Sequence, residues 1–369
     1  MNFECLQENL SKSLGVVVRA VPTKGALPVL SNVLINAAHG KVTLTVTNLE
    51  TVITSTFPAL VEKEGSTTVP AKMFNEYISN LNPGKLIISS ERNILSVVSL
   101  PKTKTKFNGM SSIEFPEIPT PNNSKSYLEI NPKILSSLVS HTSFSSSVDV
   151  TRPVLTGTLI DFTDGILSFV TTDGFRLSEN THNIEGEFSN FKVVVPTKTL
   201  QDVSKIFSNI DENISLIFNS DDNLVFFQGN NISVGVRVID GTFPDYKRII
   251  PSSKSISVTF KGNDLKEAVR LTSIFSKESN SSIKIEITDI GTLRVFTSSE
   301  ESGEHVSEFE AVIDGNPLII SFNSKYLNDF LNNIKADEIF FESNGGVTPV
   351  VFKSNELNNF LHIIMPMKL

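Results

Sequence analysis

Short alternating segments occupy most of the chain. Runs such as Lys41–Val46, Ile232–Val238 and Ile283–Ile287 place Val, Ile or Leu at every second position, with polar residues or Gly between them. A period of two is typical of strands that bury one face of an antiparallel sheet. Pairs such as Asp164-Gly165 separate these runs and favour tight turns. The pattern therefore predicts many short antiparallel strands.

Six stretches have helical spacing instead. In the first of them, Leu10, Leu14 and Val17 fall on one stripe, as expected for a helix that packs on a sheet. Strands and helices together predict an α+β fold, with the helices on one face of antiparallel sheet. The predicted helices are Gln7–Arg19, Ala71–Asn80, Pro132–His141, Thr197–Asn209, Asn263–Ser276 and Ser324–Lys335.

The same order of elements recurs three times. A strand that leads into a helix opens each copy, and a later strand-to-helix joint carries Lys72, Lys198 and Lys325, which are 126 and 127 residues apart. This period is the length of a whole domain. Segments rich in proline and polar residues, starting at Phe115 and Phe243, mark the boundaries. We therefore predict three copies of a two-helix plus antiparallel-sheet module, at residues 1–121, 126–250 and 251–369.

The net charge of −8 at first argues against a nucleic-acid partner. However, the six predicted helices sum to +4, which leaves −12 for the rest of the chain. Chance accounts for such a split, or else the helices share a face that meets an anion. The single cysteine, Cys5, and the absence of an apolar run long enough to span a membrane or of a secretory leader favour the cytoplasm.

No catalytic centre is evident in the sequence. The five histidines are scattered without metal-ligand spacing, and no glycine-rich phosphate loop or nucleophile elbow is present. Asp164, Asp173 and Asp240 each precede a glycine, and the preference of Asp-Gly pairs for tight turns explains these residues without catalysis. The apolar ending Met365-Pro366-Met367 is unusual for a terminus, and it favours a peptide-docking groove slightly over simple packing. We expect no metal, no cofactor and no catalysis.

Seven motifs together resemble a known family. They keep their order from the first module to the last residue, and the resemblance is to the bacterial replicative sliding clamps, the β subunits of DNA polymerase III. The motifs are Leu27–Asn32, Thr67–Lys72, Phe115–Pro119, Thr151–Gly157, Thr172–Leu177, Val238–Tyr246 and Met365–Leu369.

The resemblance implies a homodimer whose subunits join head to tail into a closed ring around double-stranded DNA. Twelve helices spaced by about 10 Å would line a bore of roughly 35–40 Å, which admits a duplex with water around it. Basic helices inside the ring and an acidic exterior would explain why the helices carry +4 and the rest of the chain −12. Such a ring slides without sequence preference and acts as a processivity factor. Its implied partners are the DNA polymerase III alpha subunit, the clamp loader and other proteins that carry a clamp-binding motif.

The resemblance also implies particular site residues. DNA-facing positions fall on Lys24, Lys72 and Lys198, and subunit-interface positions fall near Phe107, Ile274 and Phe275, where core packing is an equally good interpretation. The pocket for partner peptides of the type Q-L-x-L-F maps to Arg152, Leu155, Thr172, Gly174, Phe175, Arg176, Leu177, Pro244, Ile249, Ile363, Met365, Pro366, Met367 and Leu369.

Roles within that pocket follow from the same resemblance. The apolar residues would receive the Leu and Phe anchors, and Arg176 would orient the peptide. Phe175 stands where many members of the family have a histidine, and Asp149 and Val150 stand where some have a DNA-contacting glutamine, so we assign no DNA contact to that loop.

Two other functions remain open from the sequence. One is a hydrolase or transferase of repeated modules with acids at Asp173 and Asp240, and the other is a peptide-binding scaffold that does not bind DNA. An enzyme would gather its polar groups in one cleft, whereas the repeat distributes lysines over all three copies.

Overall fold

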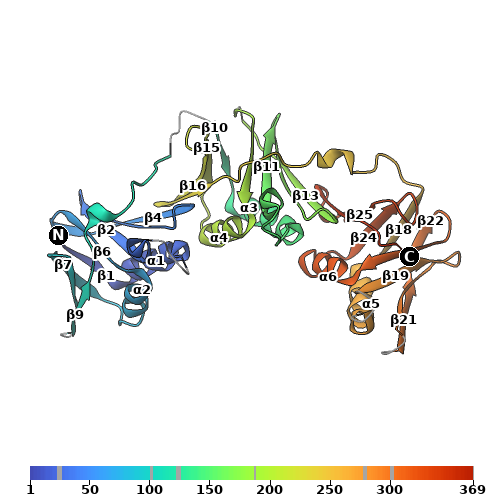
Figure 1. Cartoon of the computed structure of the whole chain (residues 1–369), viewed down its shortest axis with the longest axis horizontal. Helices are drawn as coiled ribbons and strands as arrows, with labels where there is room; N and C mark the ends of the chain where they lie inside the picture. Colours follow the sequence, from blue (N-terminus) through green and yellow to red (C-terminus); the bar gives the residue numbers. More distant parts are fainter. Residues whose placement is uncertain are drawn as a thin grey trace. The chain divides into compact units, whose positions relative to one another are not determined.

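The structure is a computed structural model that describes residues 1–22, 27–99, 103–121, 126–186, 188–276, 281–299 and 303–368. Contacts group the chain into two compact units (Figure 1). The first unit comprises Met1–Lys133 with Asp202–Val238, and the second comprises Ile134–Gln201 with Ile239–Leu369. Both units combine helices with runs of antiparallel strands, which confirms the α+β prediction.

The first unit contains two antiparallel sheets among its described residues. The order of the smaller sheet is β5 (Leu60–Lys63), β1 (Asn2–Leu6), β7 (Lys85–Glu91), β8 (Ile94–Ser99) and β9 (Thr103–Asn108). The order of the larger sheet is β10 (Ser126–Ile130), β15 (Ile214–Asn219), β16 (Leu224–Gly229), β17 (Ile232–Arg237), β4 (Thr51–Pro58), β3 (Lys41–Thr47), β2 (Asn32–Ala38) and β6 (Gly65–Pro70).

The second unit also contains two antiparallel sheets in the part that the structure describes. The larger runs β14 (Phe191–Pro196), β11 (Gly157–Thr163), β12 (Ile166–Thr172), β13 (Arg176–Asn183), β26 (Phe360–Ile364), β25 (Val350–Lys353), β24 (Glu338–Ser343), β18 (Ile256–Lys261) and β22 (Val312–Asp314). The smaller runs β21 (Gly303–Glu310), β20 (Thr292–Ser299), β19 (Ser282–Ile287) and β23 (Leu318–Asn323).

All six predicted helices are present, with ends within two residues of the prediction. Apolar stripes bury them as expected: α1 packs on β4 and α2 through Leu10, Leu14 and Val17, and α5 packs on α6 and β20. The helices are α1 (Gln7–Val17), α2 (Ala71–Ser79), α3 (Pro132–Thr142), α4 (Thr197–Phe207), α5 (Gly262–Phe275) and α6 (Ser324–Asn333).

The internal repeat is visible in the hydrogen bonds of single turns. In the turn between β3 and β4, the Thr47 hydroxyl donates to the Thr51 carbonyl, and Asn48 Oδ1 accepts the Glu50 and Thr51 amides. The turn between β12 and β13 repeats the same bonds with Thr172 and Asp173 in those places. Equivalent sequence positions in the first two copies therefore build the same local structure.

The two large sheets each combine strands from two predicted modules. Strand β17 of the central module pairs with β4 of the first, and β13 of the central module pairs with β26 of the third. Backbone hydrogen bonds along these pairs tie neighbouring modules together, so the central module is divided between the two units. The three module boundaries remain a prediction from the repeat.

Candidate functional site

The turn Thr172–Arg176, which contributes to the predicted peptide pocket, is held by a network of local hydrogen bonds. Thr172 Oγ1 donates to the Arg176 carbonyl at 2.6 Å and accepts the Gly174 amide at 3.1 Å, while Asp173 Oδ1 accepts the Phe175 and Arg176 amides. Gly174 has φ +94°, a conformation that favours glycine. These bonds hold Phe175 at the tip, where 60% of its surface is exposed.

Arg176 lies beneath that turn and is only 6% exposed. Its Nε donates to Asp173 Oδ2 at 3.0 Å and its Nη1 donates to Asp329 Oδ2 at 2.7 Å. The guanidinium carbon also lies 4.6 Å from the centre of the Tyr326 ring. The guanidinium thus faces groups of its own chain, and a direct contact between Arg176 and a bound peptide stays a prediction.

A cavity of about 400 Å³ opens beside this turn. The sequence predicted three of its residues, Arg152, Phe175 and Arg176. It missed Tyr326 at the start of α6, although the repeated Lys325 beside it was a usable signal. The lining consists of Ser146, Ser147, Val148, Asp149, Arg152, Asp173, Phe175, Arg176, Asn323, Lys325 and Tyr326.

A buried apolar cluster contains two of the other predicted pocket residues. Leu177 and Ile363 pack there with Phe243 and Tyr246, and both are almost fully buried. Leu155 is buried as well, whereas Pro244 and Ile249 are exposed. The predicted apolar pocket residues that are exposed or half-buried are therefore Phe175, Pro244, Ile249, Met365, Pro366 and Met367.

The C-terminal tail runs directly past the turn. Strand β26 pairs with β13 so that Ile364 lies opposite Arg176, and the next amide, that of Met365, donates to the Phe175 carbonyl at 2.8 Å. Further on, the Met367 amide donates to the Ser321 carbonyl at 2.8 Å. The structure thus brings the C-terminal tail next to the Thr172–Arg176 turn, as the pocket prediction requires. Leu369 lies outside the described residues.

His362 lies on β26, two residues before Ile364, and is completely buried. Its Nδ1 is 2.8 Å from the Ser178 hydroxyl, and its ring stacks on Phe330 with centroids 5.0 Å apart. Burial, and secondarily the charge of Arg176, lowers the pKa of His362 to about 3. The side chain is therefore neutral in the folded chain at physiological pH.

This burial predicts acid sensitivity. Between an unfolded pKa near 6.5 and the folded value near 3, the unfolded chain binds the proton and the folded chain does not. Stability is therefore retained above pH 6.5 and falls as the pH drops, by about 1.4 kcal/mol per pH unit from His362. Urea unfolding from pH 7 to 4 should show a shallower dependence for His362→Gln. The exposed control His39→Gln should follow the wild type, and equal slopes for all three proteins would contradict the assignment.

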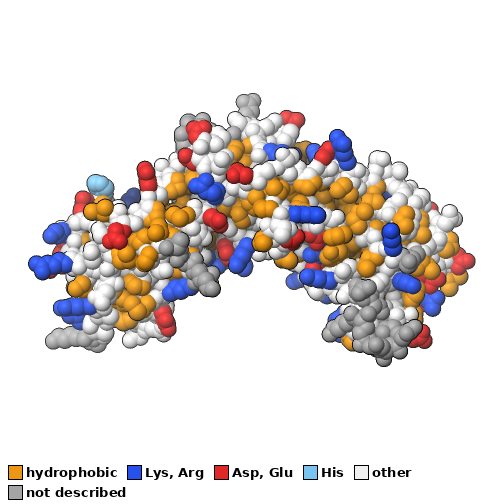
Figure 2. All heavy atoms as spheres, viewed as in Figure 1, with side chains coloured by type: hydrophobic (Ala, Val, Ile, Leu, Met, Phe, Trp, Pro, Cys, Tyr) orange, Lys and Arg blue, Asp and Glu red, His pale blue; other side chains and the backbone are white. Residues whose placement is uncertain are grey.

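Two of the three predicted DNA-facing lysines lie in the part of the chain that the structure describes. Lys72 and Lys198 are exposed and occupy the second position of α2 and of α4, and Lys24 lies outside the described residues. Figure 2 shows Lys and Arg side chains interspersed with Asp and Glu over the viewed face, with no single large basic patch there. DNA contact by these lysines therefore stays a prediction.

For Phe107, the sequence left subunit contact and core packing open. The side chain is only 3% exposed and packs edge-on against Phe74 and Tyr77 at 5.2 and 5.4 Å. It belongs to the core of the first unit because β9 turns it inward. At the other end of the chain, Ile274 is 59% exposed, and Phe275 stacks on His305 of β21 at 5.5 Å.

The hydrolase or transferase hypothesis placed its catalytic acids at Asp173 and Asp240, and the structure does not bring the two together in one cleft. The Asp173 carboxylate is occupied by two backbone amides and by Arg176, and Asp240 is exposed in a turn. In the part of the chain that the structure describes, no group of three or more His, Cys, Asp and Glu side chains could hold a metal ion. Likewise, no helix among the described residues is long and apolar enough to cross a membrane.

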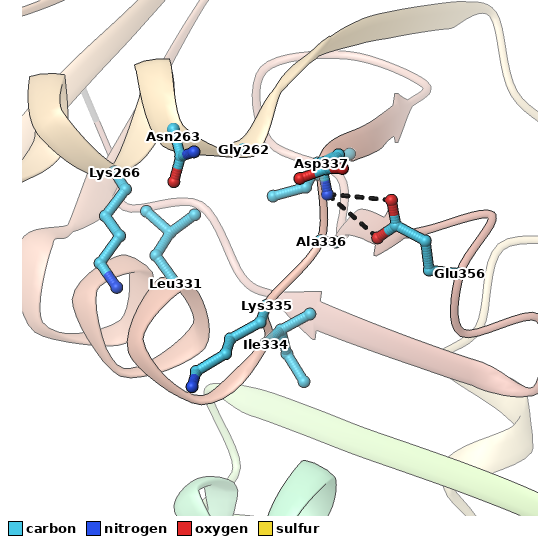
Figure 3. Close-up of a pocket in the computed structure, with 10 residues that line it drawn as sticks. Gly262, Asn263, Lys266, Leu331, Ile334, Lys335, Ala336, Asp337 and Glu356 are labelled. Carbon is cyan, nitrogen blue, oxygen red and sulfur yellow. Dashed lines mark hydrogen bonds between the residues drawn. The ribbon is translucent and has the colours of Figure 1, made fainter.

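A second cavity, of about 530 Å³, lies where α5 begins and α6 ends. Leu331, Ile334 and Ile339 contribute buried apolar surface, and Lys266 and Lys335 extend on one side (Figure 3). On the other side, Glu356 accepts the Asp337 amide through both carboxylate oxygens, each at 3.0 Å. No residue of the predicted sites lines this cavity.

Curated relatives match the whole chain. The beta sliding clamp of Staphylococcus epidermidis is 28% identical over 378 residues, covering 100% of this chain and 99% of the relative. That of Synechococcus elongatus is 28% identical over 374 residues, with full coverage of both. The solved beta subunit of Streptococcus pyogenes DNA polymerase is 26% identical, with a TM-score of 0.94 and full coverage of both chains.

A solved clamp from Bacillus subtilis, 24% identical, supports the fold with a TM-score of 0.95 over 100% of this chain and 99% of that one. The three domains of the DNA polymerase III beta subunit family match in order: the N-terminal domain at residues 1–119, the central domain at 129–245 and the C-terminal domain at 247–368. The chain therefore belongs to the DNA polymerase III beta subunits, the bacterial sliding clamps, whose function is that of a processivity factor.

Proposed function

We propose that two copies of this chain join head to tail into a closed ring around duplex DNA and hold partner proteins at the cavity beside Phe175. The observation that carries this proposal is the match of all three family domains, in order, over the whole chain. The ring is an accessory subunit that binds rather than catalyses, and its replication role implies a cytoplasmic location.

Two sheet edges support the head-to-tail dimer. In the described part of the chain, β9 is the outermost strand of its sheet in the first unit, and β21 is the outermost strand of its sheet in the second. Outer strands offer backbone groups for pairing with another chain. Joining one end of a copy to the other end of its partner is a heterologous contact, which closes into a ring when the rotation allows.

The two edges also carry opposite charge. On β9, the exposed side chains of Lys104 and Lys106 share one face, and on β21 those of Glu304, Glu308 and Glu310 share one face. Opposite charges across a strand pair stabilise it, and like charges destabilise it. Complementary charge would thus favour β9 against β21 over either strand against itself.

This dimer predicts a mass and a charge-swap result. Sedimentation should give about 81 kDa, twice the 40.5 kDa of the chain. Replacing Lys104 and Lys106 by Glu sets like charges against each other and should weaken the dimer about 100-fold. Adding Glu304→Lys and Glu310→Lys to the same chain should restore it. Glu308 is left unchanged because it pairs with Arg294 at 3.4 Å.

The control for this swap is a chain with Lys41→Glu and Lys63→Glu, two exposed lysines away from β9. It should dimerise like the wild type. A monomeric wild type would contradict the proposed edge contact. So would a charge-swapped chain whose dimer is as weak as that of the chain with only the β9 substitutions.

The cavity beside Phe175 supports partner docking. It combines exposed aromatic surface from Phe175 with Tyr326, and two cations, Arg152 and Lys325, lie at its lining. Most of the lining is polar or charged, so the aromatic rings would receive an apolar anchor while the polar groups orient the peptide. We assign to this site the alpha subunit of DNA polymerase III, the clamp loader and other proteins with short Leu- and Phe-containing motifs.

A further inference from the structure

The buried Arg176 joins two separate elements of the second unit. One is the turn between β12 and β13, which holds Asp173, and the other is α6, which holds Asp329 and Tyr326. Asp173 and Asp329 lie far apart in sequence, and they meet only through the one guanidinium. The planar fork of arginine suits this, because its separate N–H groups can serve two carboxylates at fixed angles.

Both elements supply lining residues to the cavity beside Phe175. Asp173 and Phe175 come from the turn, and Asn323, Lys325 and Tyr326 come from the start of α6 and the residue before it. Asp329, one helical turn after Lys325, does not line the cavity. The bond between Arg176, which lines the cavity, and Asp329, which does not, therefore connects the two elements that form the lining.

The burial of this network makes it stiff. Arg176 is 6% exposed, and the side chains of Asp173 and Asp329 are 14% and 32% exposed, so water screens the two ion pairs less than it would screen pairs on the surface. If Asp329 lost its charge, Arg176 would keep only Asp173, and nothing else described in the network would anchor α6 to the turn by an ion pair. A site whose supporting residues are loose binds less tightly, because ordering it then costs affinity.

From this geometry we infer that Arg176 and Asp329 are positioning residues for partner docking. Their ion pair fixes the spacing between the Phe175 turn and Tyr326 of α6, so that a cavity of the right width exists before a partner peptide arrives. Arg176 itself lines the cavity, and through its ion pairs it also holds Phe175 and Tyr326 in place for the peptide. This inference rests on the proposed docking function and deepens it.

The test uses the full chain and a fluorescein-labelled pentapeptide, Gln-Leu-Ala-Leu-Phe, with binding followed by fluorescence anisotropy. Asp329→Asn should weaken binding about tenfold while the thermal unfolding midpoint stays close to that of the wild type. Asp329→Glu keeps the charge and should bind within about threefold of the wild type. Arg176→Lys, which keeps the charge but loses the fork, should resemble Asp329→Asn.

The matched control is Glu286→Gln, which breaks another arginine–carboxylate pair of the same unit, to Arg294 at 2.9 Å. It should bind the peptide like the wild type. Wild-type affinity in Asp329→Asn would overturn the positioning role alone. Equal losses of affinity in Asp329→Asn and Glu286→Gln would also overturn it, because a general destabilisation would then explain both. A wild-type chain that does not bind the pentapeptide would overturn the docking function itself, and the positioning role with it.

Discussion

A chain that ends at Ile364 is expected to lose partner docking almost completely, by at least about 100-fold in affinity for a Leu- and Phe-containing peptide. The deletion removes Met365, Pro366 and Met367, which are half-buried beside the turn, and the two backbone bonds to Phe175 and Ser321. Strand β26 stays intact, so the fold should persist. Anisotropy with the labelled pentapeptide measures the loss, and sedimentation measures whether the dimer remains.

Lys368→Ala is the control for that deletion, because Lys368 is exposed and follows the last of those bonds. It should bind like the full chain. If the shortened chain kept wild-type affinity, the tail would not belong to the docking site. If it also lost the dimer, the loss of binding would reflect a damaged fold instead.

Neutralising Lys24, Lys72 and Lys198 together is expected to shorten replication products roughly tenfold. Lys72 and Lys198 are exposed at the starts of α2 and α4, where they are free to meet phosphates. Each lost phosphate contact also lowers the salt dependence of the interaction. The measurement is the length of DNA made per binding event by polymerase with loaded clamp, at several salt concentrations.

The matched control replaces Lys41, Lys63 and Lys261, three exposed lysines on strands, by Ala. The net charge then changes equally, so a general charge effect would appear in both variants. Unchanged product length in the Lys24, Lys72 and Lys198 variant would show that these lysines do not face DNA.

The sequence predicted the helices and the repeat well because local rules determine them. Apolar stripes at helical spacing fixed α1 through Leu10, Leu14 and Val17, and the ends of all six helices lie within two residues of the prediction. The turn at Thr172–Arg176 was also readable, since Asp173 and Gly174 are turn formers. These features need only neighbours along the chain.

Features that depend on distant partners were left open or missed. Whether Phe107 faces solvent depends on Phe74 and Tyr77, which come from another element, so its alternation alone could not place it. Arg176 was expected to meet a peptide, and only the fold shows its ion pair with Asp329. The division of the central module between two units likewise follows from strand pairing that has no local signal.

Enclosure of DNA is the central claim, and loss of the protein from cut DNA tests it most directly. The clamp, labelled and loaded by a clamp loader onto a nicked circular plasmid, is separated from free protein by gel filtration before and after one restriction cut. A ring that holds DNA by topology should stay on the circle and leave the linear molecule by sliding off its ends within minutes. Equal retention on circular and linear DNA would show that contacts, and not enclosure, hold the protein, and would contradict the account.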